Sequence, residues 1–226
     1  TLATVRGRVD AGLRRVGYFI IPISLGYVVI GEALIAALFQ GNEFGASDTR
    51  LVWLVLCGYS LGLMATTSSR LLQNTLYALD DPRTPARIAL VRVLVGTAAA
   101  LAMMFVFDGY VVDGVSIEAE TSETTDLLHL GAMGIALGSM IGAWTEFVLL
   151  RLALRWRIGS VTVFGGRVPS LAMVAAAAVG AGAAVRTVVG GLPSPVAAAA
   201  IFSVAGAVYV GGTYALGHDV RRELRG

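Results

Sequence analysis

Long runs of apolar residues dominate the hydrophobic pattern of this chain, and short polar segments separate them. Each run has about the 20 residues that an α-helix needs to cross roughly 30 Å of hydrocarbon. A soluble domain of this length would not need so many runs of this kind, so the pattern predicts an all-α fold, a polytopic bundle of membrane-spanning helices. The six predicted spans are Val16–Phe39, Leu51–Tyr77, Ile88–Phe107, Leu130–Ala153, Pro169–Gly190 and Val196–Gly217.

Apolar residues also recur at helical spacing ahead of the first span, among them Val5, Val9 and Leu13. This spacing predicts a short amphipathic helix on the inner membrane surface, with a plain solvated linker as the alternative. The chain opens at Thr1 without an initiator methionine, a signal peptide or a leading span, so we expect it to be a piece of a longer protein. Transporters are often built from two related halves, and these spans with an entering linker would form one such half.

Arginine is concentrated on alternate connections between the spans. Because cationic loops resist translocation, the Arg-rich side is predicted to be cytoplasmic, which also places both termini inside. Ser47 and Ser122 are then expected outside the membrane, and Thr84 and Ser160 in the cytoplasm. The arginines behind this prediction are Arg6, Arg8, Arg14, Arg15, Arg83, Arg87, Arg151, Arg155, Arg157, Arg167, Arg221, Arg222 and Arg225.

Composition further limits the class of protein to which the chain can belong. Apolar residues make up 56% of the chain, which excludes a disordered chain and an ordinary soluble core. The formal net charge of +2 hides the asymmetry of the loops and is a poor guide to partners, and no nucleic acid is expected to bind. Cys57 is the single cysteine and lies inside the second span, so no disulfide can form within the chain and a cysteine metal site is not expected.

Two connections carry local structure signals. In the inner turn Asp80–Pro85, Thr84 is predicted to cap the third helix, with Pro85 at its first position. In the long outer connection, Tyr110–Ile117 has an Asp-Gly turn between β-forming residues and predicts a small hairpin. The acidic residues around this hairpin lack the spacing of a calcium loop, so a solvated acidic loop is the preferred interpretation.

Small residues repeat at helical intervals in two spans. Gly134, Gly138 and Gly142 recur every fourth residue on the fourth span, and Gly58 and Gly62 form a shorter repeat on the second. Such stripes let two helix backbones approach closely. These stripes indicate helix–helix packing rather than a catalytic or binding site.

A polar stripe on the second span is the main candidate site. It consists of Tyr59, Thr66, Arg70, Gln73 and Tyr77, which share one helical face, with Asn74 at its border. Polar groups are costly in hydrocarbon unless they face protein or a water-filled cavity, so the stripe is predicted to point inward. Arg70 has two interpretations, an anion-binding group in a polar cavity or a cation that snorkels to the interface.

Other intramembrane charges are weaker candidates. Arg92 and Glu146 are interpreted as side chains that reach the inner interface, although Glu146 is kept as a candidate cavity residue. Glu32 is expected to act locally near the outer surface, and Pro22 to kink or loosen the first helix. The predicted substrate-binding or cavity-lining residues are therefore Tyr59, Thr66, Arg70, Gln73, Asn74 and Glu146, with no catalytic and no metal-ligating residue.

Three short motifs resemble those of a known family, in the same order and spacing. Leu38–Phe44 resembles an outer turn of the MurJ (MviN) lipid II flippases, Gly58–Leu63 their following helix, and Tyr77–Pro85 their inner turn. The resemblance covers roughly residues 1–160, and the last two spans match mainly by position and hydropathy. The family belongs to the multidrug/oligosaccharidyl-lipid/polysaccharide exporter superfamily.

The resemblance implies a C-terminal portion of a flippase with two pseudo-symmetric lobes and two added C-terminal helices. It implies a cytoplasmic amphipathic linker helix at residues 1–15, four spans of the C-terminal lobe at 16–153, two additional spans at 154–217 and a cytoplasmic tail at 218–226. The substrate would be an undecaprenyl-pyrophosphate-linked peptidoglycan precursor, moved by alternating access across the bacterial inner membrane. The lobes would enclose a cationic cavity, in which Arg70 occupies a position that is commonly basic, and the added helices would line a groove for the lipid tail.

The same resemblance implies partners and leaves alternatives open. Membrane lipids and the missing N-terminal lobe are the expected partners, no cofactor is expected, and coupling to the membrane potential or to an ion gradient stays open. The alternatives are another exporter of the superfamily, either an oligosaccharide-lipid flippase or a drug/cation antiporter, and a structural membrane scaffold. A membrane enzyme is disfavoured because His129 and His218 are isolated on opposite sides and no acid, base and metal cluster converges.

Overall fold

The computed structural model describes residues 2–41, 44–113, 116–119, 128–159, 168–189 and 194–215. In these residues six helices are long and apolar enough to cross a membrane, which confirms the predicted polytopic helical bundle. The helices are α1 (Leu2–Phe39), α2 (Ala46–Ala78), α3 (Arg83–Asp108), α4 (Gly131–Ile158), α5 (Val168–Val189) and α6 (Ser194–Ala215).

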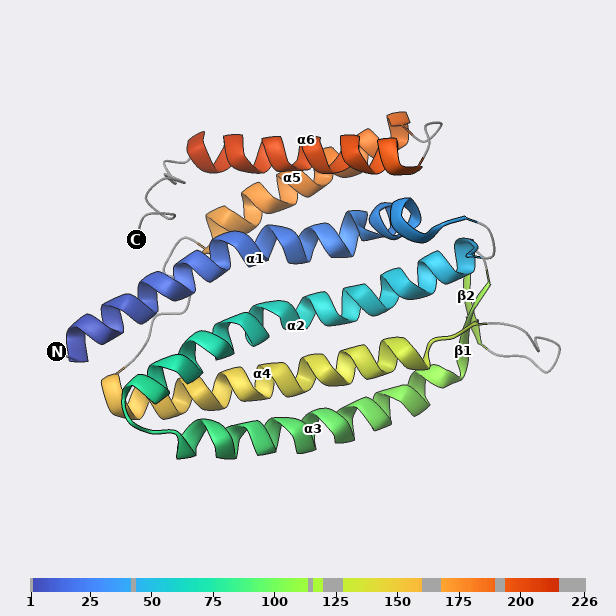
Figure 1. Cartoon of the computed structure of the whole chain (residues 1–226). Coiled ribbons are helices and arrows are strands. Elements are labelled where there is room, and N and C mark those ends of the chain that lie inside the picture. The colour runs from blue at the N-terminus through green and yellow to red at the C-terminus, as the bar shows by residue number, and fades with distance from the viewer. Residues whose placement is uncertain are drawn as a thin grey trace.

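Helix α1 joins two groups of helices. Figure 1 shows α5 and α6 on one side of α1 and α2, α4 and α3 on the other, in that order. A buried apolar cluster links α1 to α2 and α4 through residues such as Leu13, Leu72 and Leu150. A second cluster links α1 to α5 and α6 through residues such as Tyr18 and Ala175. The last two helices are therefore attached to the rest of the bundle through α1.

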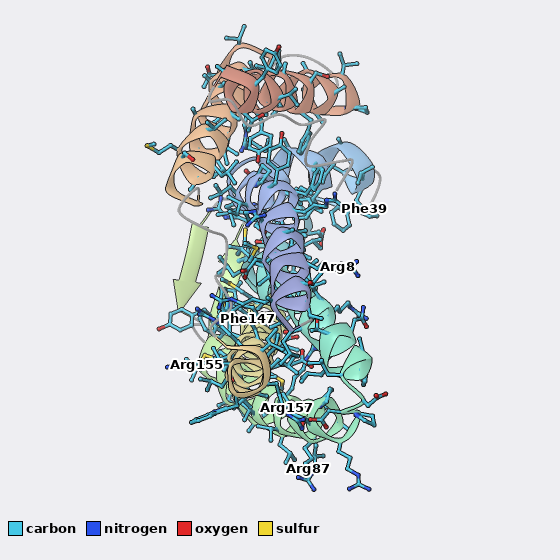
Figure 2. All side chains as sticks on the ribbon, turned by 90° about the vertical axis from the view of Figure 1, so that its left-hand side faces the viewer. Arg8, Phe39, Arg87, Phe147, Arg155 and Arg157 are labelled. Carbon is cyan, nitrogen blue, oxygen red and sulfur yellow. The ribbon has the colours of Figure 1, made fainter. Side chains whose placement is uncertain are left out.

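The arginines gather at one end of the bundle. Figure 2 looks at this end, and Arg8, Arg87, Arg155 and Arg157 all lie there, on α1, α3 and α4. The chain reverses direction at each connection, so the N-terminal end of α1 and the C-terminal end of α6 share this end with the α2–α3 turn. The charge asymmetry seen along the sequence is thus an asymmetry in space.

The amphipathic segment before the first span is helical, as predicted, but it is not a separate helix. It continues without a break into the first span as a single helix of 38 residues. Its apolar side chains Val9 and Leu13 are buried in one cluster with Leu72, Leu76 and Leu154, rather than lying on a membrane surface. Packing against α2 and α4 buries this apolar face as effectively as a lipid interface would.

The glycine stripe on α4 brings the α3 and α4 backbones into direct contact. A methyl group added at Gly138 would overlap the backbone of Ala100, and one added at Gly142 would lie 2.9 Å from Cα of Gly96. The shorter stripe on α2 has the same role, since a methyl group at Gly58 would lie 2.9 Å from Cβ of Ala136. The packing interpretation of these stripes is confirmed.

The outer connection between α3 and α4 folds into the predicted hairpin. Strand β1 (Tyr110–Asp113) pairs antiparallel with β2 (Ser116–Ala119), and β3 (Leu128–His129) pairs with the other edge of β1. Asp113 of the predicted Asp-Gly turn is the last residue of β1 and pairs with Ser116. Residues 114 and 115 between the two strands, and much of the acidic loop, lie outside the described residues. Within the described residues no group of three acidic, histidine or cysteine side chains could hold a metal ion.

The turn between α2 and α3 differs from the prediction in its cap. Helix α3 begins at Arg83, so Thr84 lies inside it and the predicted Thr84 cap is wrong. The Asp81 carboxylate instead accepts hydrogen bonds from the backbone N–H and the hydroxyl of Thr84 and pairs with Arg157 at 2.7 Å. The Thr84 hydrogen bonds, more than the charge of Arg157, lower the pKa of Asp81. This carboxylate therefore stays charged and ties the turn to the end of α4.

Candidate functional site

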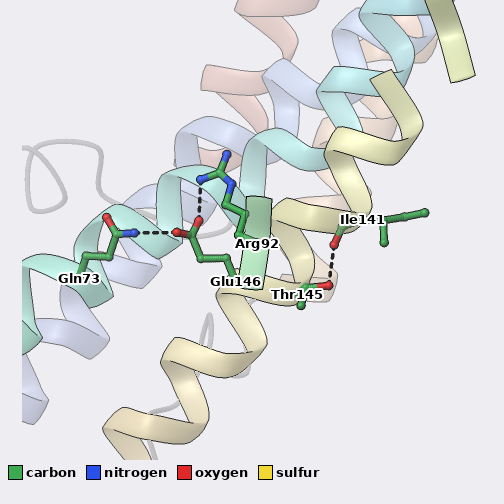
Figure 3. A network of polar contacts seen from close by, with 5 residues as sticks. All are labelled: Gln73, Arg92, Ile141, Thr145 and Glu146. Carbon is green, nitrogen blue, oxygen red and sulfur yellow. Dashed lines mark hydrogen bonds and ion pairs between the residues drawn. The ribbon is translucent and has the colours of Figure 1, made fainter. Parts of the chain in front are cut away.

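A buried carboxylate on α4 lies at the centre of the polar network inside the bundle. Glu146 is only 1% exposed, and its two oxygens accept hydrogen bonds from two different helices. Gln73 on α2 donates from Nε2 to Oε1 at 2.7 Å, and Arg92 on α3 donates from a terminal nitrogen to Oε2 at 2.6 Å. Figure 3 shows both contacts. One carboxylate thus joins α2, α3 and α4.

Electrostatics explains why these three side chains occur together. A buried carboxylate is strongly disfavoured in a low-dielectric interior unless it is paired and hydrogen-bonded. Arg92 supplies the opposite charge, and Gln73 donates to the other oxygen. The Arg92 side chain is 36% exposed, so the pair is buried on the glutamate side and open on the arginine side.

The open side of the pair faces a small cavity. Its volume is about 280 Å³, and its lining includes Tyr59 of α2, Arg92 and Thr97 of α3, and Ser139 of α4. These side chains provide a guanidinium and three hydroxyl groups, all of which can donate hydrogen bonds. The cavity can therefore accommodate an uncharged polar group or an anionic one.

The interpretation of Arg92 and Glu146 as side chains that snorkel to the inner interface is wrong. Both are engaged with each other between α3 and α4. The attraction between the two charges removes the need to reach water, and the close backbone approach along the glycine stripe places the two helices near enough for the pair to form. Glu146 is not among the residues that line the cavity and is connected to it through Arg92, a lining residue that the sequence interpretation missed.

The predicted stripe on α2 divides into two parts. Gln73 contacts Glu146, and Tyr59 lines the cavity beside Arg92, so these two predicted residues belong to the network region. Arg70 and Asn74 lie on an exposed face of α2, and Thr66 is half-buried. Among the described residues, Arg70 makes no hydrogen bond or ion pair. The stripe is therefore brought together only in part, and Arg70 lies on a surface apart from the Glu146 network.

A second cavity, apolar, lies on the other side of α1. It has a volume of about 580 Å³ and is lined by α1, α5 and α6, with side chains such as Ile23, Tyr27, Val179 and Phe202. We call it the apolar groove. Glu32 of α1 pairs with Arg186 of α5 at 2.7 Å, which agrees with the local role expected for Glu32.

The chain matches a known family over most of its length. A family model described as lipid II flippase MurJ matches residues 3–198. A probable lipid II flippase MurJ of Vibrio cholerae is 30% identical over 122 residues, which cover 54% of this chain and 23% of that protein. A lipid II flippase MurJ of Burkholderia cenocepacia is 27% identical over 148 residues, 66% of this chain and 24% of that protein. The chain spans less than a quarter of the length of these relatives.

Proposed function

The chain belongs to the MurJ family of lipid II flippases, and from this membership we propose that it forms part of a transporter that moves a lipid-linked peptidoglycan precursor across the bacterial inner membrane. The family match over residues 3–198 is the observation that carries the proposal. It favours a lipid II flippase over a drug/cation antiporter, an oligosaccharide-lipid flippase or a scaffold. The matched relatives are named as flippases, which supports transport rather than catalysis.

Two surfaces of the bundle suit the two parts of such a substrate. The apolar groove between α1, α5 and α6 has the chemistry to hold a polyprenyl chain, because apolar side chains dominate its lining. The exposed face of α2 around Arg70 and Asn74 has the chemistry to line a path for a pyrophosphate and sugars. The N-terminal lobe would close this path, so the isolated chain is expected to insert into membranes without transporting the precursor.

Arg70 provides the test of this assignment. A permanent cation within a membrane span would attract a pyrophosphate more strongly than in water, because the dielectric constant is reduced there. In the full-length protein we expect Arg70→Ala to reduce precursor translocation strongly and Arg70→Lys to retain much of it. The measurement is translocation of labelled precursor in vesicles, or rescue of flippase-depleted cells, normalised to the amount of membrane protein.

Arg87→Ala is the matched control, because it removes an exposed arginine at the Arg-rich end of the bundle. It should leave translocation unchanged. Wild-type translocation by Arg70→Ala at equal abundance would contradict a role for Arg70 in the substrate path and leave it as an interfacial anchor.

We further propose that the Arg-rich end faces the cytoplasm. Ala46 and Ala86 are exposed alanines in the first turns of α2 and α3, at opposite ends of the bundle. Single cysteines there, in a Cys57→Ala background, can be treated with a membrane-impermeant thiol reagent in intact cells. We expect labelling at position 46 and none at position 86, because arginine-rich connections resist translocation. The reverse pattern would overturn the orientation.

A further inference from the structure

Pro22 leaves a gap in the backbone hydrogen bonding of α1. It lies inside the helix and has no N–H, so the carbonyl of Tyr18, four residues earlier, loses its partner within the helix. In hydrocarbon no water is available to replace that partner, and an unsatisfied carbonyl would be costly. Figure 1 shows α1 changing direction along its length, as expected for a helix with an internal proline.

Helix α6 supplies the missing partner. The hydroxyl of Tyr209 donates to the carbonyl oxygen of Tyr18 at 2.6 Å, in a buried position. The Tyr209 side chain is only 8% exposed, and its ring lies 5.6 Å from the ring of Tyr18. A phenol hydroxyl from another helix thus donates the hydrogen bond that the proline cannot.

A second buried hydrogen bond ties the same two helices together. The Tyr18 hydroxyl lies 3.1 Å from Oγ1 of Thr213, one turn beyond Tyr209 on α6. Oγ1 of Thr213 donates to the carbonyl of Val210 at 2.9 Å, so it accepts from Tyr18. Tyr18 therefore accepts from α6 through its carbonyl and donates to α6 through its side chain, which fixes both the position and the direction of contact.

From this geometry we propose that Tyr209 is a positioning residue that holds α6 at the proline interruption and stabilises the bend of α1. Tyr18, Pro22 and Tyr209 all line the apolar groove, so the contact sets the separation of its α1 and α6 walls. A consequence for transport rests on the proposed function, because only a groove that holds a lipid chain makes its width important for the substrate. The contact between α1 and α6 does not depend on that function.

A double-mutant cycle between Tyr209→Phe and Pro22→Ala tests the proposal in the full-length protein, reconstituted in vesicles. Spin labels at positions 14 and 214, both exposed, report the distance between α1 and α6 in a background from which Cys57 and any other cysteine of the full-length protein have been removed. Loss of a hydrogen bond worth about 1 kcal/mol should raise the population of separated conformers roughly fivefold in Tyr209→Phe. In the Pro22→Ala background the same substitution should have no such effect, because the N–H of residue 22 can satisfy the Tyr18 carbonyl.

Tyr18→Phe is the matched control, since it removes the bond to Thr213 and keeps the Tyr209 contact with the backbone. It should shift the distances in both backgrounds equally. An unchanged distribution in Tyr209→Phe, or an equal effect of Tyr209→Phe with and without Pro22, would overturn the proposal. Translocation of labelled precursor is measured on the same vesicles. If the wild-type protein transports none, the proposed function fails while the distance cycle still decides the role of Tyr209.

Discussion

Replacing Arg92 by alanine is expected to destabilise the full-length protein by about 3 kcal/mol or more, because it leaves the buried carboxylate of Glu146 without its opposite charge. Glu146 is only 1% exposed in the folded bundle. The reciprocal change, Glu146→Ala, should cost less, since the Arg92 side chain is already 36% exposed and can extend further toward solvent. Thermal unfolding in detergent and the amount of monodisperse protein on size exclusion measure both effects.

A rescue experiment separates charge from packing. In the Arg92→Ala background, Glu146→Gln should recover part of the lost stability, because an uncharged amide is less costly to bury and can still contact Gln73. Thr145→Val is the matched control, since the Thr145 hydroxyl donates to the Ile141 carbonyl of its own helix, as Figure 3 shows, and to no other group in the described part of the chain. It should be nearly neutral. Equal stability of the wild type and Arg92→Ala would mean that the ion pair contributes nothing to the bundle.

The spans were predictable because a hydrophobic run of the required length has few alternatives in a membrane protein. Thus α3, predicted at 88–107, occupies Arg83–Asp108. The surroundings of residues 1–15 were less predictable, since the apolar face of an amphipathic helix can be buried by lipid or by protein. Only the positions of Leu72, Leu76 and Leu154 show that α2 and α4 bury it.

The polar network was only half predictable. The stripe on α2 identified Gln73, but the partners of a polar side chain depend on which helices become neighbours. Arg92 follows the first residue of α3 by nine positions and Glu146 precedes the last residue of α4 by twelve, so the two lie at similar depth in an antiparallel pair. This match, together with the glycine stripe on α4, was the signal that could have predicted the ion pair. No such signal could predict an ion pair for Arg70, because it has no charged partner among the described residues.

Gly138→Ala is the substitution on the α3–α4 interface from which we expect the largest loss of folded protein. The added methyl group would overlap the backbone of Ala100, which cannot move aside as a flexible side chain can. Overpacking of this kind costs about 1–3 kcal/mol and occasionally more, and a clash with backbone belongs at the upper end. Because α3 packs mainly against α4, separating the two helices would also stretch the Arg92–Glu146 pair. We expect a lower unfolding temperature and little monodisperse protein on size exclusion.

Two other glycines distinguish packing from the general preference of helices for alanine. A methyl group at Gly180 would meet no atom within 4 Å, so Gly180→Ala should be neutral or slightly stabilising, because alanine is the better helix former. A methyl group at Gly96, on the facing helix, would lie 3.5 Å from Cα of Gly142, which is an ordinary contact. Gly96→Ala should therefore lower the stability only slightly. If Gly138→Ala lowered the stability no more than Gly96→Ala, the two backbones could not be in contact at Ala100. The register of α3 on α4, which also aligns Arg92 with Glu146, would then be incorrect.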